Sequence, residues 1–404
     1  MPHRIQSPMA LAASAVFMYL PIPLVIATRP PKAVRLLLFV SQLLVANWAT
    51  TTLKASDDTF ATNVLGCMLY GMPPFMAIDF YFLTDPLMNG TRHLYDKQAA
   101  KDMPFLERLW WSTCFFASLR GVGWNKPVPH LRQIPKGQTR ASFLFEHAFW
   151  LGIYLLISDF ANLYFSHNPI TSSRYAEGFP ITSQGPIFQA LNSFIFWSNA
   201  WAGFNMAYEA CALLGVGLGF WEPQFWPPMF GSIWDAYTVR RTWGRFWHCI
   251  LRRFVASQGK WVAQVIGAKP GTKASSYSQL YTAFFISGII HEAGARMLDT
   301  TFGRCTCFFM LQALWITLED GVIGLGKRLG VKESAATRAL GGLVTFVWFA
   351  ATTPVMLGVM TDIGGKLHSP AYSGSIIETV WRALGMEGRV EIPWPEPQPQ
   401  YYRI

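Results

Sequence analysis

The hydrophobic positions of this 404-residue chain gather into long runs instead of alternating with polar positions. A helix that crosses a membrane needs about 20 mostly apolar residues, because the hydrocarbon core is about 30 Å thick. Eight runs meet this length and predict eight transmembrane helices, at Met9–Ala27, Leu36–Leu53, Phe60–Leu83, Phe143–Phe165, Phe188–Gly219, Leu280–Leu298, Cys305–Gly326 and Ala339–Met360. The pattern therefore predicts an all-α, polytopic membrane protein.

The basic residues test this arrangement. With eight spans, 24 of the 33 Lys and Arg residues fall on one side of the membrane and only eight on the other. Basic loops face the cytosol, so both termini are expected on the lumenal side, and we expect the membrane to be the endoplasmic reticulum. The net charge of +10 is explained in this way. No basic, aromatic-interleaved motif suggests a nucleic-acid partner, and the lipid bilayer is the expected one.

The composition agrees with a membrane protein. Hydrophobic residues make up 51% of the chain and charged residues only 14%, whereas soluble domains carry roughly 25% charged residues. Two long cytosolic loops, 84–142 and 220–279, are rich in Trp, Phe and Arg. This composition favours interfacial helices on the membrane surface or a wall around a ligand. We expect one domain over 1–404, with an extended, proline-rich tail at 390–404.

His291 is the most informative polar residue. It lies inside an apolar run, where an ionisable side chain is costly and indicates a functional site. Eleven residues into its span, or about 16 Å, it is predicted near the middle of the membrane. On a helix, Ser287 shares its face, whereas Glu292 points about 100° away and is expected to pair with Arg296. The alternative is a histidine bonded to a neighbouring helix without any chemistry.

The surroundings of His291 narrow its chemistry. His291-Glu292 would begin a zinc-protease motif only with a second histidine four residues on, and that residue is Ala295. We therefore predict no metal site. Gly288 and Gly294 keep the helix slim, which permits close helix contact or a tunnel beside the imidazole.

A second polar cluster ends at His248 in the long loop 220–279. Guanidinium groups there would pair with phosphates such as those of coenzyme A, which enters from the cytosol. The alternative is a surface helix whose arginines reach into water at the positive, cytosolic side. The cluster contains Arg240, Arg241, Trp243, Arg245, Phe246, Trp247, His248, Arg252 and Arg253.

At these two clusters the chain resembles a known family. The segment Ser287–Glu292 resembles the S-G-x-x-H-E signature of wax-synthase-like acyltransferases, within the membrane-bound O-acyltransferase superfamily. The segment Trp243–His248 resembles the upstream F-W-x-R-x-W-H/N element. Arg120–Trp124 and Trp226–Gly231 resemble further patches of the fungal branch. The likeness covers a core of about 105–365.

The resemblance implies O-acyl transfer from an acyl-CoA to an alcohol, with His291 as the catalytic base. Many members have Asn where this chain has His248, which is expected to bind the thioester or position the acceptor. The fungal branch implies acetyl-CoA as co-substrate, no bound cofactor, and a hydrophobic terpenoid or meroterpenoid alcohol. Residues expected to contact substrate or CoA are Arg240, Arg241, Trp243, Arg245, Trp247, Ser287 and Glu292.

Three alternatives stay open from the sequence. A long-chain acyl-CoA:alcohol acyltransferase of the wax-ester type would use the same residues with a wider tunnel. A membrane transporter of hydrophobic metabolites would use the buried charges as a relay. A haem held between His291 and a histidine of another span, such as His147, is the third.

Overall fold

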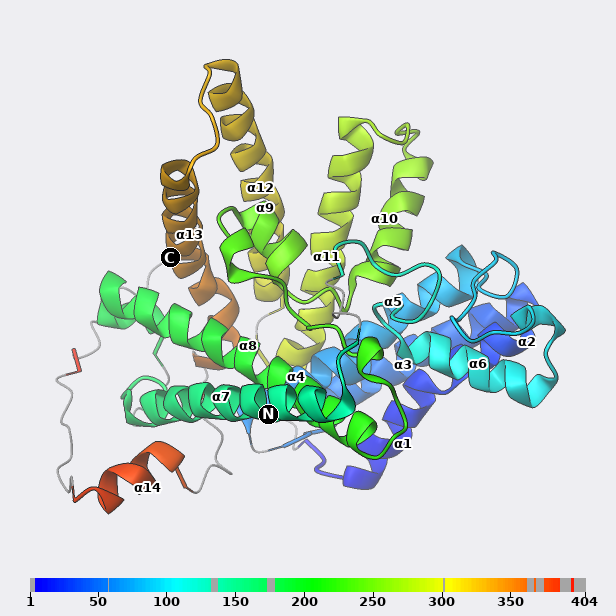
Figure 1. The fold of residues 1–404 in the computed structure, drawn as a ribbon, viewed down its shortest axis with the longest axis horizontal. Helices are drawn as coiled ribbons and strands as arrows, with labels where there is room; N and C mark the ends of the chain where they lie inside the picture. Colours follow the sequence, from blue (N-terminus) through cyan, green and yellow to red (C-terminus); the bar gives the residue numbers. More distant parts are fainter. Residues whose placement is uncertain are drawn as a thin grey trace. The chain divides into compact units, whose positions relative to one another are not determined.

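The computed structural model describes residues 4–395 apart from 57, 132–136, 173–178, 301, 362–366, 368–373 and 386–393. Within those ranges the regular structure is helical, and the two β-bridges are isolated, which confirms the all-α prediction. The α-helices of Figure 1 are α1 (Pro8–Tyr19), α2 (Pro21–Thr28), α3 (Lys32–Thr52), α4 (Thr59–Gly66), α5 (Met72–Ile78), α6 (Phe105–Ala117), α7 (Arg140–His167), α8 (Pro186–Gly217), α9 (Val239–Arg241), α10 (Arg252–Val265), α11 (Lys273–Met297), α12 (Arg304–Arg328), α13 (Ala335–Thr361) and α14 (Ile376–Ala383). Shorter 3-10 or π-helical turns are η1 (Cys67–Gly71), η2 (Asp79–Leu83), η3 (Ala100–Asp102), η4 (Ile181–Gln184), η5 (Pro223–Phe225), η6 (Ile233–Asp235) and η7 (Thr242–Phe246).

Each of the eight predicted transmembrane segments is helical. Six stretches among the described residues are long and apolar enough to cross a membrane: Pro8–Thr28, Lys32–Thr52, Thr59–Leu83, Arg140–His167, Arg304–Arg328 and Ala335–Thr361. The other two predicted spans correspond to α8 and α11, helices of 32 and 25 residues that fall outside this group. The integral-membrane prediction is confirmed, while the number of eight crossings stays a prediction.

The chain divides into two compact units, which are described separately. Unit 1 comprises Met1–Ser56, Thr62–Leu131 and Phe230–Arg338, and unit 2 comprises Asp57–Ala61, Arg132–Met229 and Ala339–Ile404. The prediction of one domain over 1–404 stays a prediction. Most of the expected extended tail at 390–404 lies outside the described residues. Its Trp394 is described and packs against Tyr164 of unit 2, with ring centroids 5.2 Å apart.

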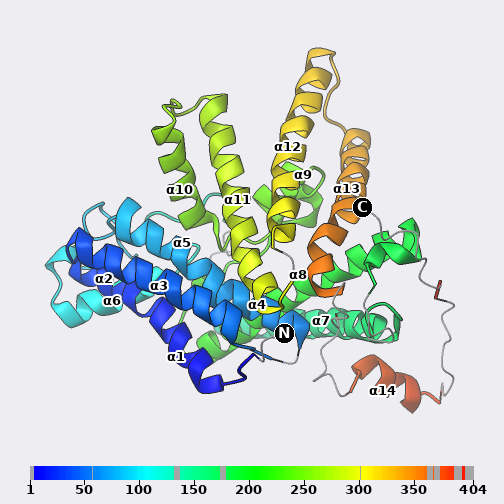
Figure 2. The same ribbon diagram turned by 180° about the vertical axis from the view of Figure 1, so that it is seen from behind.

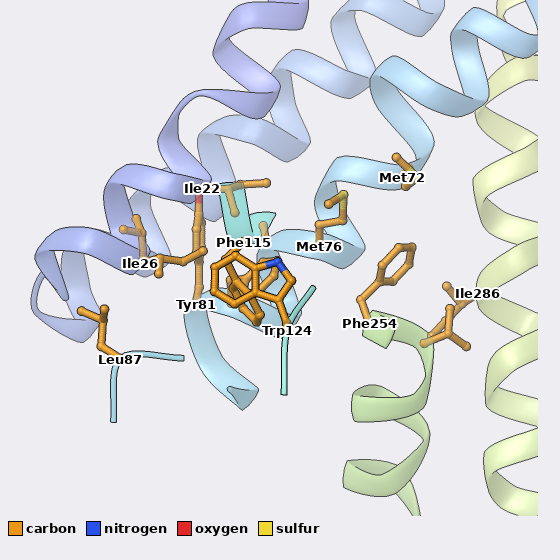
Figure 3. Close-up of a cluster of buried hydrophobic side chains, with 14 of the residues drawn as sticks. Ile22, Ile26, Met72, Met76, Tyr81, Leu87, Phe115, Trp124, Phe254 and Ile286 are labelled. Atoms are coloured by element: carbon orange, nitrogen blue, oxygen red, sulfur yellow. The ribbon is translucent and has the colours of Figure 1, made fainter. Parts of the chain in front are cut away.

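Unit 1 is built around a hydrophobic core that joins its N-terminal helices to α6, α10 and α11. Figure 3 shows side chains of this core, including Ile22, Ile26, Met72, Met76, Tyr81, Leu87, Phe115, Trp124, Phe254 and Ile286. The long loop 84–142 supplies part of it, because Trp111 stacks on Phe115 and Phe115 meets Trp124. The exposed large apolar residues of α6 are Phe105, Leu106 and Trp110. The aromatic residues of this loop therefore serve the core as well as any membrane surface.

The helix that carries His291 begins earlier than its apolar run. Thr272 caps α11 by accepting a hydrogen bond from Ser275 N, so α11 starts at Lys273 and not near Leu280. His291 is therefore 18 residues, or about 27 Å, from the first residue of its helix. It lies nearer the end that leads into α12. The mid-membrane position inferred from the shorter run stays a prediction.

Small residues let α11 approach its neighbours closely, as the sequence predicted. Helices α10, α11 and α12 pack in sequence order, and α11 also crosses the helix formed by α4 and η1 (Figures 1 and 2). A methyl group on Gly288 would lie 2.7 Å from the Cα of Thr306 in α12, and one on Gly294 would lie 2.3 Å from the Asn63 carbonyl oxygen. Both glycines allow helix contacts that any larger residue would push apart.

Unit 2 is organised around the long helices α7 and α8, which pack along each other. Side-chain amides hold their ends together, because Asn192 Oδ1 accepts from Tyr164 and Asn168 at 2.8 and 2.9 Å. Helix α13 joins α8 through a hydrogen bond from Trp197 Nε1 to Thr353 Oγ1. Polar residues inside these apolar helices thus pair with one another, as lipid-facing helices require.

Candidate active site

The imidazole of His291 is oriented by its own helix. Its Nδ1 lies 2.7 Å from the carbonyl oxygen of Ser287, one turn earlier. A carbonyl oxygen only accepts hydrogen bonds, so Nδ1 carries the proton and Nε2 keeps its lone pair. Ser287 does share the face of His291, but its hydroxyl donates to the Ala283 carbonyl oxygen at 3.0 Å. The arrangement leaves Nε2 able to take a proton from a substrate.

Aromatic rings line the space beside this imidazole. Phe309 of α12 is closest, with its ring centroid 4.6 Å from that of His291. The Trp243 ring of η7 lies 5.7 Å from Phe309 and 5.8 Å from Phe284 of α11. Phe309 and Phe284 are only 4% and 6% exposed. The three rings form an aromatic wall at His291, defined here as Trp243, Phe284 and Phe309.

The segment that carries Trp243 is tied to α12 by two acidic residues. Glu319 accepts hydrogen bonds from the backbone amides of Val239 and Arg240 at 2.9 and 3.1 Å. Asp320 accepts from Arg240 Nε at 2.9 Å and from the Tyr277 hydroxyl at 3.0 Å. Arg240 is thus paired within the protein, with its side chain 39% exposed. These contacts fix the start of the segment on the α11–α12 pair.

His248 ends the same segment and lies in a second group of rings. Phe230 lies 5.8 Å from His248 and 5.2 Å from Trp247, measured between ring centroids. The neighbouring Gly231 donates from its N to the Phe246 carbonyl oxygen at 2.8 Å. A methyl group on Gly231 would lie 2.0 Å from the Arg245 carbonyl oxygen, so only glycine fits. Two patches that were separate in the sequence therefore form one packed unit.

The two histidines are neighbours. Burial of its ring lowers the pKa of His248 to about 3, and the nearby charges of His291 and Arg120 act in the same direction. His248 is therefore neutral at physiological pH. Because His291 lies close enough to influence its charge, the structure brings together both histidines that the sequence singled out.

Glu292 has a different partner from the one expected. Its Oε1 accepts a hydrogen bond from Thr306 N at 2.8 Å, in the first turn of α12. A carboxylate there also meets the positive end of the helix dipole. Within the described residues Glu292 makes no ion pair with Arg296, so that expectation is wrong. The i+4 geometry permitted the pair, but the buried Glu292, 2% exposed, lies against α12.

The remaining candidate arginines differ in how closely they pair with acidic residues of the protein and in how exposed their side chains are. Arg241 pairs with Asp235 and lies over the Tyr237 ring at 4.3 Å. Arg245 approaches Asp235 only to 3.9 Å, and 45% of its side chain is exposed. Of the three arginines singled out for phosphate binding, Arg245 is the most available to an anion.

Arg252 and Arg253 bind the chain itself. Arg252 donates to the Pro129 carbonyl oxygen at 2.9 Å and also to that of Gly244. Arg253 donates to the Ser118 carbonyl oxygen at 2.8 Å. These bonds hold the loop around Arg120 against the segment that ends at His248. They explain how the buried Arg120 comes close to that histidine.

Several residues of the site were not assigned a role from the sequence. Arg120 was visible only as part of a patch, and Phe230 likewise. Phe309 had no signal, because one Phe among 31 is not distinctive in a membrane helix. Glu319 and Asp320 lie within the predicted span Cys305–Gly326, but the sequence does not indicate their partners. Contacts across distant segments define all five positions.

A further histidine site lies in unit 2. His147 of α7 is hydrogen-bonded through Nδ1 to Glu209 of α8, and Phe143 stacks on its ring with centroids 3.7 Å apart. The histidine considered as a haem partner is therefore engaged by a carboxylate. In the part of the chain that the structure describes, no group of three His, Cys, Asp or Glu side chains is placed to hold a metal ion.

A membrane-embedded enzyme is the class that fits long apolar helices with two neighbouring imidazoles beside a ring-lined wall. Comparison with known proteins gives the family. Residues 226–311, which include both histidines, match the sequence model of the Membrane bound O-acyl transferase family. Acetyltransferase ple2 of Rhodocybe pseudopiperita is 34% identical over 363 residues, covering 88% of this chain and 92% of the relative.

Two further relatives support the same family. Acetyltransferase eriL of Hericium erinaceus is 28% identical over 312 residues, 76% of this chain and 78% of its own length. Acetyltransferase sirH of Emericella nidulans is 29% identical over 269 residues, 64% of this chain and 61% of its own length. The chain belongs to the membrane-bound O-acyltransferases, and it is an enzyme that transfers an acyl group to an alcohol.

Proposed function

We propose that the enzyme transfers an acetyl group from acetyl-CoA to a hydroxyl of a hydrophobic secondary metabolite of the terpenoid or meroterpenoid class. The similar proteins named acetyltransferases support the donor. The aromatic wall beside His291 supports it independently, because large rings leave little room for a long acyl chain. The apolar character of the surrounding helices supports a lipophilic acceptor.

The proposed base is His291, and the observation that carries this assignment is the bond from Nδ1–H to the Ser287 carbonyl oxygen. As the acceptor oxygen attacks the thioester carbon, Nε2 takes the hydroxyl proton. The tetrahedral intermediate then collapses, the carbon–sulfur bond breaks, and the imidazolium returns the proton to the CoA thiolate. Such general-base catalysis contributes roughly 10²–10⁴-fold.

His248 has a separate proposed role. Because it stays neutral, one ring nitrogen can donate a hydrogen bond to the thioester carbonyl oxygen, where negative charge develops. The family's Asn would supply the same donor from a side-chain amide. The exposed Arg245, together with Arg240 and Arg241 beside it, would hold the CoA phosphates at the outer end of the segment. Trp243 and Trp247 would flank the pantetheine arm, with Ser287 as a further contact, whereas the buried Glu292 would support the site by holding the start of α12.

The proposed location is the endoplasmic reticulum, with both termini in the lumen and loop 220–279 in the cytosol. The excess of Lys and Arg in the loops on that side supports this orientation. Single cysteine reporters at each terminus and in loop 220–279, labelled in sealed microsomes, test it. A membrane-impermeant reagent should label only the loop. Labelled termini would contradict the orientation.

The function is tested in microsomes with labelled acetyl-CoA and a panel of terpenoid alcohols. His291→Ala, matched for expression, is expected to lose at least about 100-fold in turnover. His248→Ala should lose activity, and His248→Asn should retain more of it, because Asn restores a hydrogen-bond donor. Unchanged turnover of His291→Ala would refute the proposed base. Thioester hydrolysis without ester formation would refute transfer to an alcohol.

A further inference from the structure

The space beside the proposed base is bounded by a ring that is fixed in place. Phe309 lies 4.6 Å from the His291 imidazole and is 4% exposed. Trp243, Phe284 and Phe308 surround it, with centroids 5.7, 6.5 and 5.2 Å away. Side chains packed on several sides do not rotate out of the way without opening the core. The position of this ring is therefore set by α11, α12 and η7 together.

The reaction places the acyl chain in that neighbourhood. The hydroxyl oxygen must lie within about 3 Å of the accepting nitrogen of His291 while it attacks the thioester carbon. The carbon atoms that follow the carbonyl are then within a few bonds of the imidazole. The ring of Phe309 borders this volume, so each added methylene of a longer donor approaches the ring.

The carrier side of the donor fits this geometry. Arg245, the most exposed of the three arginines considered for phosphate binding, and Trp243, which contacts Phe309, lie on the same short turn, η7. A CoA molecule held at Arg245 would direct its thioester past Trp243 toward Phe309 and His291. The wall then stands at the acyl end of the donor.

We infer that Phe309, supported by Trp243, limits the donor to short acyl groups and is a specificity-determining residue of this enzyme. The inference rests on the proposed role of His291 as the base. Removing the ring in Phe309→Ala deletes six carbon atoms, more than the four methylenes by which a hexanoyl group exceeds an acetyl group. Since one methylene in an apolar pocket changes kcat/KM by about 10–200-fold, a large change in donor preference is expected.

The test compares acetyl-, butyryl-, hexanoyl- and octanoyl-CoA with one acceptor alcohol, using full-length enzyme in microsomes. The ratio of kcat/KM for hexanoyl-CoA to that for acetyl-CoA should rise at least about tenfold in Phe309→Ala. Phe165→Ala is the matched control, since Phe165 is a fully buried phenylalanine on α7 of unit 2 and is not one of the rings packed around Phe309. It should leave the ratio unchanged even if it lowers overall activity.

Two further variants keep the inference open to refutation. Phe309→Leu tests it where Phe309→Ala fails to insert, and it should shift the ratio in the same direction by a smaller factor. Phe309→Trp should lower the butyryl-to-acetyl ratio. An unchanged donor ratio in inserted Phe309→Ala or Phe309→Leu, or a change of acceptor range alone, would overturn the inference. His291→Ala separates the two proposals, because it should be inactive with every donor, whereas only the Phe309 variants should alter preference.

Discussion

The protein places histidines in two apolar regions and holds each through Nδ1, but with different kinds of partner. On α11, His291 Nδ1 donates to the Ser287 carbonyl oxygen of the same helix. On α7, His147 Nδ1 meets the carboxylate of Glu209 on α8. The first bond stays within one helix, whereas the second joins two helices. On the proposed function, the buried histidine of unit 1 serves chemistry, whereas that of unit 2 pairs two helices.

Replacing each of these two histidines by alanine should give the largest difference in kcat. His291→Ala should lower kcat by about 10²–10⁴-fold, because the base is lost. His147→Ala should keep kcat within a few-fold of the wild type and lower thermal stability instead. Kinetics and thermal unfolding of both variants in detergent check this. Equal losses of kcat in the two variants would remove the distinction.

The two buried carboxylates sharpen the comparison further. Glu292→Ala removes the acceptor of Thr306 N at the start of α12, and Glu209→Ala removes the partner of His147. Each should cost about 1–3 kcal/mol of stability, as expected for a hydrogen bond to a charged group. Only Glu292→Ala should also lower kcat, because α12 carries Phe309. Conservative Glu→Gln variants, which keep an acceptor oxygen, serve as controls.

Acid should lower the stability of the folded protein, because the folded state keeps His248 neutral. Its pKa is held near 3 by burial, followed by His291 and Arg120, whereas an unfolded chain titrates near 6.5. The unfolded state therefore binds more protons, so the stability is complete above pH 6.5 and is lost as the pH falls toward 3. The melting temperature should fall on the order of a few degrees between pH 6.5 and 5.

Variants separate this contribution from other acid effects. His248→Asn should lack it, and Arg120→Gln should reduce it by raising the pKa of His248. A melting profile with the same pH dependence in the wild type and His248→Asn would contradict the assignment.

The smallest effect should come from Ser287→Ala. The bond that fixes the His291 tautomer uses a main-chain carbonyl, so kcat should change by no more than about twofold. Ser287→Pro is no substitute, because proline would disturb the helix itself. A loss of kcat comparable to that of His291→Ala would show that the hydroxyl, not the carbonyl, matters.

The sequence predicted the helices well because apolar runs and helix caps are local features. All eight predicted segments are helical, and even the early start of α11 has a local signal in Thr272. The His291–Ser287 relationship followed from helix geometry alone. The partner of Glu292 did not, since helix spacing favours Arg296 whereas the observed bond reaches α12. Phe309 and Arg120 acquire meaning only from contacts between segments far apart in the chain, which no local pattern encodes.

Helix α12 contributes residues to both ends of the site. Asp320 anchors the arginine-bearing segment, and Phe309 stands beside His291 eleven residues away, a rise of about 16 Å along the helix axis. The helix therefore keeps these two residues at a fixed distance from each other. On the proposed CoA site, a donor whose phosphates are held by Arg240, the partner of Asp320, must carry its thioester on an arm of comparable reach. Thioesters of small, arm-less thiols cannot bridge that distance while remaining bound at both ends.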